Sequence, residues 1–401
     1  MNNTTQTIFK GDASRLKNII PMNDRVSEKS FHEEIKKIFS KSWLVVGSAE
    51  ELKERGSYLV VDVPPLKASL IIVRGDDNKI RVFHNICRHR GDKLVHTDTG
   101  CLNAFTCKFH AWTFANNGNL IGVTDATQFK DLDREKMGLI EIHSEVWENF
   151  VFVNFDPNPS KTLKEWLGDA YEQYKGFSDN RVKICDHRVV INTNWNLATN
   201  AFGEGYHNKY IHKNTVPDYQ GGATNPNRHR AYIEVGDQFA RYSAHGNPNH
   251  KPTKVEEILY RHSRPMFPSF TSFDMDALPP GINPSRFSQW GFDIVHFFPN
   301  FVFGAHANTH SMMWFWPIDH KTTDIRVMRF GFQSDKPSDR IAQAYSLVRG
   351  REVLREDLAT METQYQALAS GGLPFMFLSE QEQVIQNHYR ASDDLLTENE
   401  K

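Results

Sequence analysis

Two short segments of the sequence each carry one cysteine and one histidine. The first offers Cys87 and His89, and the second, about twenty residues on, offers Cys107 and His110. Thiolates and imidazoles are the side chains through which proteins bind zinc and iron. The sequence therefore predicts a metal centre to which two loops each supply one sulfur and one nitrogen ligand.

The mixed pairing distinguishes two kinds of metal centre. A structural zinc site also takes two cysteines and two histidines, but it usually pairs Cys with Cys and His with His. A Rieske [2Fe–2S] cluster needs two cysteines on one iron and two histidines on the other, so each loop can supply one ligand to each iron. The pattern favours the two-iron cluster, and zinc stays as the alternative.

A second set of possible metal ligands lies in the middle of the chain, where four residues separate His207 from His212. Mononuclear iron(II) oxygenases bind their metal through two histidines and one carboxylate. Five residues advance a regular α-helix by about 500°, so both imidazoles reach one metal only if the helix ends or distorts between them. A mononuclear site is one interpretation, and two unrelated surface or core histidines are the other.

The two sets of possible metal ligands lie in regions with different secondary-structure patterns. Between residues 43 and 156, short β-rich runs alternate with turn residues, which is typical of a small all-β domain. The polar stretch 156–162 reads as a boundary. Helical and strand signals are mixed after it, and the overall fold class is α+β. The predicted parts are an N-terminal helical segment at 1–42, an all-β domain at 43–158 and a larger domain at 159–401.

The motifs CRHRG (87–91) and CKFHAWTF (107–114) resemble the Rieske domain of the ring-hydroxylating, Rieske non-haem iron oxygenase α subunits. The resemblance extends over roughly residues 43–390. It implies that the second domain has the helix-grip fold, an antiparallel sheet wrapped around a long helix. The family pattern of the second metal site is matched by Asn194, Trp195, Glu204, Tyr206, His207 and His212.

The resemblance also implies roles for two carboxylates. Asp357 occupies the position of the family's third iron ligand, and Glu356 is the alternative. Glu204 is predicted to be a catalytic residue, because the family's carboxylate here links the iron-ligand histidine, His207, to a cluster histidine of the next subunit. Ring dihydroxylators of the family usually carry Asp at this position, and Glu is familiar in relatives that oxidise quaternary ammonium compounds.

Four residues are predicted to contact the substrate. Asn200 resembles a family position near the iron, and Phe202 follows on the same segment. Phe297 and Phe301 belong to an aromatic run, of which strand alternation points about half inward. Ordinary core packing is the alternative for these aromatic residues. An apolar substrate pocket and an aromatic cage for a cation both fit this composition.

The function implied by the resemblance is the terminal oxygenase of a multicomponent system, with one Rieske cluster and one mononuclear Fe(II) per chain. It would use O2 to hydroxylate a small organic substrate. No G-x-G-x-x-G dinucleotide motif occurs, so electrons are expected from a separate NAD(P)H-dependent reductase, with or without a ferredoxin. The family further implies a head-to-tail α3 homotrimer, with or without β subunits.

Two alternatives to this function stay open. One is a monooxygenase or demethylase that acts on a quaternary amine or aliphatic substrate. The other is a Rieske electron-transfer protein with a vestigial second site.

The composition argues against other classes of protein. The 401 residues carry 47 basic and 49 acidic side chains, and this near-neutral balance gives no support to nucleic-acid binding. No apolar run approaches the 18 residues of a membrane-spanning helix, and the N-terminus lacks the apolar core of a secretory signal. Four cysteines are too few for a disulfide scaffold. We therefore expect a cytoplasmic protein with no membrane or nucleic-acid partner.

Overall fold

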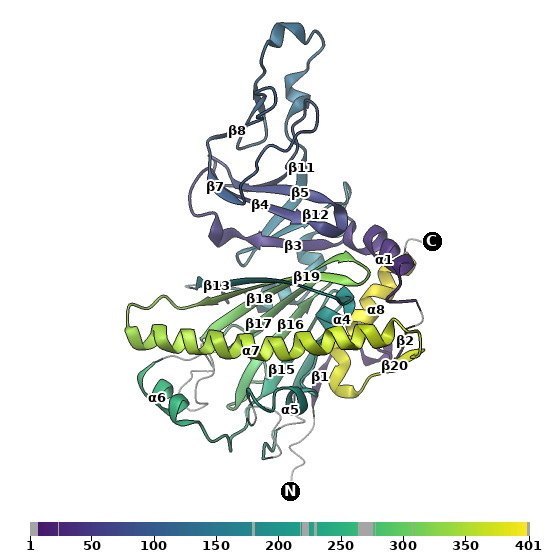
Figure 1. Cartoon of the computed structure of the whole chain (residues 1–401), viewed down its shortest axis with the longest axis vertical. Helices are drawn as coiled ribbons and strands as arrows, with labels where there is room; N and C mark the ends of the chain where they lie inside the picture. Colours follow the sequence, from purple (N-terminus) through teal and green to yellow (C-terminus); the bar gives the residue numbers. More distant parts are fainter. Residues whose placement is uncertain are drawn as a thin grey trace. The chain divides into compact units, whose positions relative to one another are not determined.

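The computed structural model describes residues 7–22, 24–178, 181–216, 218, 224–227, 231–263, 276, 278–306 and 308–398. The chain divides into two compact units. One holds residues 39–163, and the other holds residues 1–38 and 164–401. An all-β unit and a mixed unit with a largely antiparallel sheet follow one another along the chain (Figure 1), which confirms the predicted fold class.

The unit of residues 39–163 is built from two antiparallel sheets. Its buried core contains Phe105, Trp112 and Phe114 together with Cys87 and Cys107, so the core lies directly against both predicted cluster loops. The larger sheet has the order β3 (Trp43–Ser48), β12 (Phe150–Asn154), β11 (Glu141–Trp147), β6 (Ile80–His84), β5 (Ala68–Arg74), β4 (Ser57–Val63) and β7 (Thr99–Cys101). The smaller has the order β10 (Leu120–Gly122), β9 (Thr113–Ala115) and β8 (Ala104–Thr106).

The other unit is organised around an eight-stranded sheet. Every neighbouring pair is antiparallel except β1 with β14. The strand order is β1 (Ile8–Lys10), β14 (Ala231–Val235), β15 (Phe239–His245), β16 (Trp290–Phe297), β17 (Phe301–Ala305), β18 (Thr309–Asp319), β19 (Thr322–Gly331) and β13 (Val182–Ile191).

Eight α-helices occur in the described ranges. They are α1 (Glu28–Glu34), α2 (Leu163–Leu167), α3 (Ala170–Gln173), α4 (Trp195–Asn200), α5 (Asn208–Ile211), α6 (Lys254–His262), α7 (Pro337–Leu368) and α8 (Gln383–Glu398). Over these same ranges, none is both long and apolar enough to cross a membrane.

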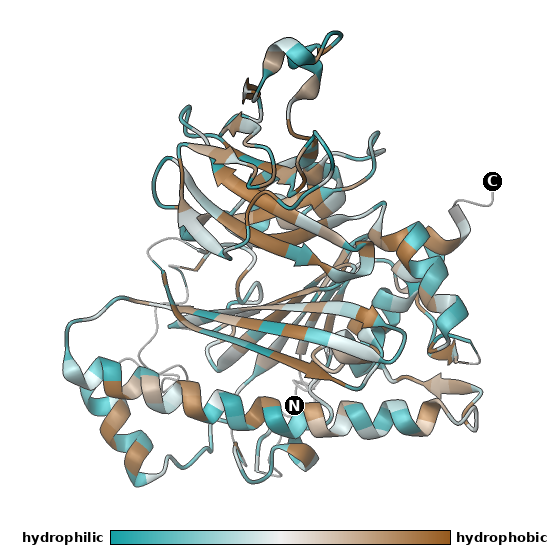
Figure 2. Cartoon of the chain, turned by 45° about the horizontal axis from the view of Figure 1, so that its top comes forward, coloured by the Kyte–Doolittle hydropathy of each residue, from teal (hydrophilic) through white to brown (hydrophobic). Residues whose placement is uncertain are grey.

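The helix α7 lies across one face of the eight-stranded sheet (Figure 1). Its 32 residues give it a length of about 48 Å. Gly350, Asp357 and Met361 are among its buried residues, and spacings of seven and four place them on one face. Figure 2 shows apolar and polar residues interspersed along this helix.

The N-terminal segment, predicted to be helical, is helical only in part. Ser27 caps α1 by accepting a hydrogen bond from the Ser30 amide at 3.1 Å. Ahead of it, β1 pairs with β14, and β2 (Ile19–Pro21) pairs with β20 (Phe375–Phe377). Strands of three residues have no readable periodicity, and their partners lie more than 200 residues away. Helix is therefore the wrong prediction for these two stretches.

Candidate metal centres

The two predicted cluster loops close in the same way. In each, the cysteine N–H donates to the carbonyl five residues on, at 2.8 Å in both loops. The amides of Gly91 and Ala111, four residues after Cys87 and Cys107, donate back to the cysteine carbonyls. Gly91 and Ala111 both have positive φ, of 83° and 55°. The loops are thus equivalent in backbone although their Cys–His spacings differ by one residue.

The equivalent loops bring like ligands together. The two cysteines are each 3% exposed. Burial raises the pKa of Cys87, and so does the neighbouring Cys107 thiol. The His89 and His110 rings lie 4.7 Å apart between centroids. Trp112 stacks on His89 at 4.9 Å, which covers that ring with an aromatic face. Two sulfurs on one side and two imidazoles on the other is the donor arrangement that a Rieske cluster requires.

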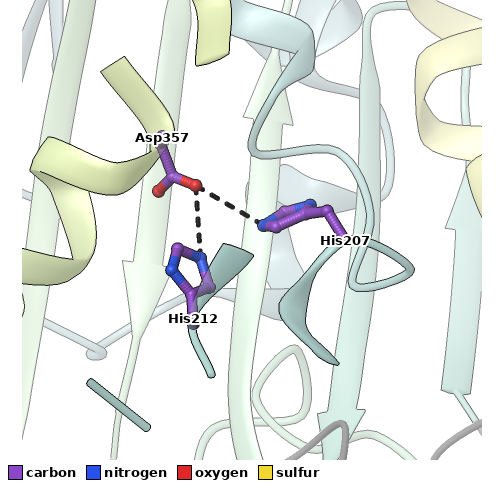
Figure 3. A group of neighbouring side chains, drawn as sticks. All are labelled: His207, His212 and Asp357. Carbon is purple, nitrogen blue, oxygen red and sulfur yellow. Dashed lines mark ion pairs between the residues drawn. The ribbon is translucent and has the colours of Figure 1, made fainter. Parts of the chain in front are cut away.

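The mononuclear site is built around the one-turn helix α5. His207 immediately precedes this helix and His212 immediately follows it, so no regular helix continues through both. Asp357 comes from the buried face of α7. Figure 3 shows both imidazoles turned toward the Asp357 carboxylate. Its Oδ1 lies 3.6 Å from His207 Nε2 and 3.2 Å from His212 Nε2.

These three side chains fit one iron ion. Ligands about 2.1 Å from a metal and at right angles to each other lie roughly 3 Å apart. The three donor atoms all lie within 4.8 Å of one another. Two imidazole nitrogens and one carboxylate oxygen form the facial donor set of non-haem iron oxygenases. Both His212 and Asp357 are buried, at 4% and 6% exposure, so the donors are held away from bulk water.

A carboxylate stands behind each imidazole. Glu204 Oε1 is hydrogen-bonded to His207 Nδ1, and Glu356 Oε2 lies 2.8 Å from His212 Nδ1. Such contacts fix the ring orientation of a metal-binding histidine and increase its basicity. Glu356, the alternative ligand on α7, thus contacts the nitrogen of His212 that faces away from Asp357.

The electrostatics of the two imidazoles follow from this arrangement. Burial lowers the pKa of both rings, but the adjoining carboxylates outweigh it, so each pKa is raised from its ordinary value. For His207 these carboxylates are Glu204 and Asp357, and for His212 they are Asp357 and Glu356. The site therefore attracts positive charge, as a cation-binding site must.

Two cavities share Ala201, Glu204, His207 and Asp357 as wall residues. The first has a volume of about 140 Å³ and is mostly apolar; it includes the predicted Phe202. The second, of about 450 Å³, includes the predicted Asn200. Both residues therefore lie beside the triad, on different cavities.

Phe297 and Phe301 lie elsewhere. Along β16, Phe292 and Ile294 line the first cavity, and successive side chains of a strand point to opposite faces. Phe297 has the other parity and lies 6.0 Å from Phe301 and 6.3 Å from Tyr174, between ring centroids. Neither predicted residue is among the described walls of the two cavities. They pack the opposite face of the sheet, so their prediction as substrate contacts is corrected.

Several wall residues of the first cavity were not predicted from the sequence. His306, Arg329 and Gly350 all line it. The alternation of β19 carried a signal for one of them, since Arg329 has the same parity as the buried Val327. No local signal marks Gly350, because its role depends on which strand packs against α7.

Comparison with known proteins identifies both units. The family described as "Ring hydroxylating alpha subunit (catalytic domain)" matches residues 163–398, and the Rieske [2Fe-2S] domain family matches residues 42–133. The 2-aminobenzenesulfonate 2,3-dioxygenase subunit alpha of Alcaligenes sp. is 26% identical over 88% of this chain and 85% of its own. The carnitine monooxygenase oxygenase subunit of Escherichia coli is 33% identical over 47% of this chain and 50% of its own.

Solved structures agree in fold. A quaternary ammonium Rieske monooxygenase in complex with L-carnitine has a TM-score of 0.72 at 20% identity, over 95% of each chain. Naphthalene 1,2-dioxygenase from Rhodococcus sp. bound to indole has a TM-score of 0.75 at 18% identity, over 95% of each chain. The family's two domains imply a [2Fe–2S] cluster and a mononuclear iron, and the donor sets described above fit both. The chain therefore belongs to the Rieske oxygenase α subunits, a family of oxidoreductases that includes mono- and dioxygenases.

Proposed function

We propose that this chain is the terminal oxygenase component of a multicomponent system and hydroxylates a small organic substrate held in the first cavity. The observation that carries the proposal is the triad of His207, His212 and Asp357, whose donor atoms lie within 4.8 Å beside that cavity. We assign these three residues as ligands of the mononuclear iron. We assign Cys87, His89, Cys107 and His110 as ligands of the cluster.

When bound, the iron supplies oxygen activation and the cluster supplies electrons. The chain's own residues supply the geometry. His207, His212 and Asp357 would hold the metal, and the cavity that they line would hold the substrate beside it. Apolar walls such as Phe202 and Met313 favour an apolar substrate body and keep water from the reacting atoms.

Glu204 holds His207 in place and is our candidate for the connection between the two metal centres. Its Oε2 accepts hydrogen bonds from the backbone amides of Tyr206 and His207, and its Oε1 contacts His207 Nδ1. The carboxylate is thus fixed at both oxygens. We propose that it links His207 to a cluster histidine of a neighbouring subunit.

The proposed partners follow from family membership. A separate NAD(P)H-dependent reductase, with or without a ferredoxin, would reduce the cluster, and three chains would form a head-to-tail ring, with or without β subunits. We also propose a cytoplasmic location. None of the four cysteines, all of which lie in the described ranges, forms a disulfide, which is consistent with a reducing compartment.

The test is a single turnover of the chemically reduced protein in labelled dioxygen. The panel would hold arenes, aryl carboxylates and sulfonates, quaternary amines and aliphatic acids, with products read by mass spectrometry. Label in a product supports an oxygenase, and two atoms in one arene product identify dihydroxylation. If the reduced, iron-loaded protein labels none of these compounds, the proposed hydroxylation of these substrate classes is contradicted.

A second candidate is a monooxygenase or demethylase of a quaternary amine or aliphatic substrate. Glu204, in place of the aspartate usual in ring dihydroxylators, and the likeness to a carnitine monooxygenase oxygenase subunit support it. One labelled atom in an amine or aliphatic product would select it. An electron carrier with a vestigial second site would hold only the two cluster irons per chain, so an iron count of three argues against that alternative.

A further inference from the structure

A cationic side chain lines the cavity beside the triad. Arg329 is on β19, and among the described wall residues of this cavity it is the one lysine or arginine. Its neighbours on the wall include Ser311 and His306, whereas most of the remaining wall is apolar. A guanidinium in such a wall presents several N–H donors in a planar fork, which suits a carboxylate or sulfonate.

The helix α7 makes room for this guanidinium. A Cβ added at Gly350 would overlap the Nη1 atom of Arg329 and come within 2.6 Å of its Cζ. Glycine is among the least favourable residues in the interior of a helix, and this one stands in the middle of 32 helical residues. The absence of a side chain at position 350 therefore has a spatial reason: the guanidinium lies where that side chain would be.

The contact with the guanidinium and the triad carboxylate lie at different positions along α7. Gly350 and Asp357 are seven residues apart, which places them on the same face of α7 and roughly 10 Å apart along its axis. The carboxylates of this cavity, Glu204 and Asp357, both contact the triad histidines. Negative charge thus gathers around the histidines, and positive charge lies about two helical turns away.

Burial makes this cation sensitive to what fills the cavity. The side chain of Arg329 is partly accessible, as a cavity wall is, but the protein around it lowers its pKa from the ordinary value. A charge in such surroundings interacts strongly with an opposite charge, because little water screens the pair. Arg329 also lines a third cavity, more polar and of about 250 Å³, with Asp339 and Gln343. Arg329 is therefore a wall residue of both cavities.

We propose that Arg329 binds the anionic group of the substrate and that the enzyme acts on small organic carboxylates or sulfonates with an apolar body. The inference rests on the proposed oxygenase function and specifies its substrate class. A cavity of about 140 Å³ is close in size to one that holds benzene in another protein. With the anion at Arg329, the apolar body extends along α7 toward the triad.

The experiment compares anionic compounds with their neutral amides. The metal-loaded protein would be titrated without oxygen, by calorimetry, with benzoate against benzamide and benzenesulfonate against benzenesulfonamide. The wild type should bind the anions about tenfold to a hundredfold more tightly. Arg329→Met should abolish that preference and change amide binding less than about twofold. Equal weakening of anions and amides, or no binding of either anion to the wild type, would overturn the proposal.

Two further variants keep the test sound if Arg329→Met folds poorly. Gly350→Ala retains the charge but displaces the guanidinium, so it should weaken anion binding and spare amide binding. Arg326→Met is the matched control, since Arg326 lies on the same strand with the opposite parity and pairs with Asp186 at 2.7 Å. It should leave the preference intact. Cluster absorbance and iron content must match the wild type in every variant.

Binding and turnover can fail independently in this design. A preference for anions that disappears in Arg329→Met, in a protein that labels no product, would contradict the oxygenase proposal and leave the anion site standing. Labelled product from a protein without any anion preference would support the oxygenase proposal and contradict the anion site.

Discussion

At the scale of single residues, the proposed mononuclear iron site includes a carboxylate behind each histidine as well as the three candidate ligands. Each imidazole presents Nε2 to Asp357 and Nδ1 to a glutamate. A neutral imidazole that binds a metal through one nitrogen carries its proton on the other. The two glutamates therefore select the tautomer that leaves Nε2 free for iron.

Glu356→Gln tests this role. The variant should bind iron about tenfold to a hundredfold more weakly, because an amide orients His212 less firmly than a carboxylate. Iron retention would be measured against a chelator. Glu352→Gln is the control, since Glu352 lies on the same helix and pairs with Arg355 at 2.7 Å, in solvent. Equal iron affinity in the two variants would mean that Glu356 only packs beside the site.

Glu204→Gln tests the proposed connection between the metal centres. We expect both metals to stay bound and turnover to fall at least about tenfold, since the carboxylate on His207 is replaced by an amide. The informative measurement is the rate at which the reduced cluster is reoxidised during a single turnover with substrate and O2. Wild-type reoxidation in the variant would reject the bridging role, whereas rescue by Glu204→Asp would support it.

At the scale of elements, the site depends on how helices dock against one another. Glu34 of α1 accepts hydrogen bonds from Trp195 Nε1 at 2.8 Å and Asn196 Nδ2 at 3.0 Å, so it ties α1 to the helix that precedes the triad histidines. Burial outweighs these bonds and raises the pKa of Glu34 to about 7. The contact thus holds a carboxyl group that stays protonated in mildly acidic solution.

The pH dependence follows from that shift. The pKa of Glu34 in the native state lies above the unfolded value of 4.5, so the native state binds more protons than the unfolded chain. The resulting stabilisation of the native state is fully present below pH 4.5. It is lost as pH rises through about 7, by up to about 3 kcal/mol. Glu34→Gln should therefore gain stability relative to the wild type between pH 5 and pH 8, measured by thermal unfolding. Glu33→Gln, on the exposed side of α1, should show no such trend.

At the scale of the whole molecule, the proposed ring requires one chain's cluster to serve another chain's iron. Co-expression of Cys107→Ser with Asp357→Ala tests this, because each variant alone lacks one centre. With equal amounts and random assembly, about a quarter of the junctions in a head-to-tail ring pair an intact cluster with an intact iron. Turnover should recover to roughly that fraction. Light scattering should give three times the chain mass of 46.2 kDa, if no β subunit is bound. No recovery in a proven mixed trimer would mean that electrons stay within one chain.

Much of the site was predictable because its ligands are local in sequence. The two cluster loops each contain a cysteine and a histidine within four residues, so their chemistry is visible without a fold. The end of the helix at His212 was also predictable, since a regular helix that continued through both histidines could not place both imidazoles on one face. The sequence by itself determined the family and the order of the units, and it predicted both candidate donor sets.

The tertiary structure decided which residues distant in sequence lie together in the site and in the wall of the cavity. The packing of α7 on the sheet puts Glu356 behind His212 and Gly350 against Arg329, and sequence spacing carries no information on such a register. The sequence also left open which face of the sheet Phe297 lies on, because a shift of one residue in the strand register turns a side chain to the other face. Local motifs specify chemistry, whereas cavity shape and substrate contacts arise from elements that meet only when the chain is folded.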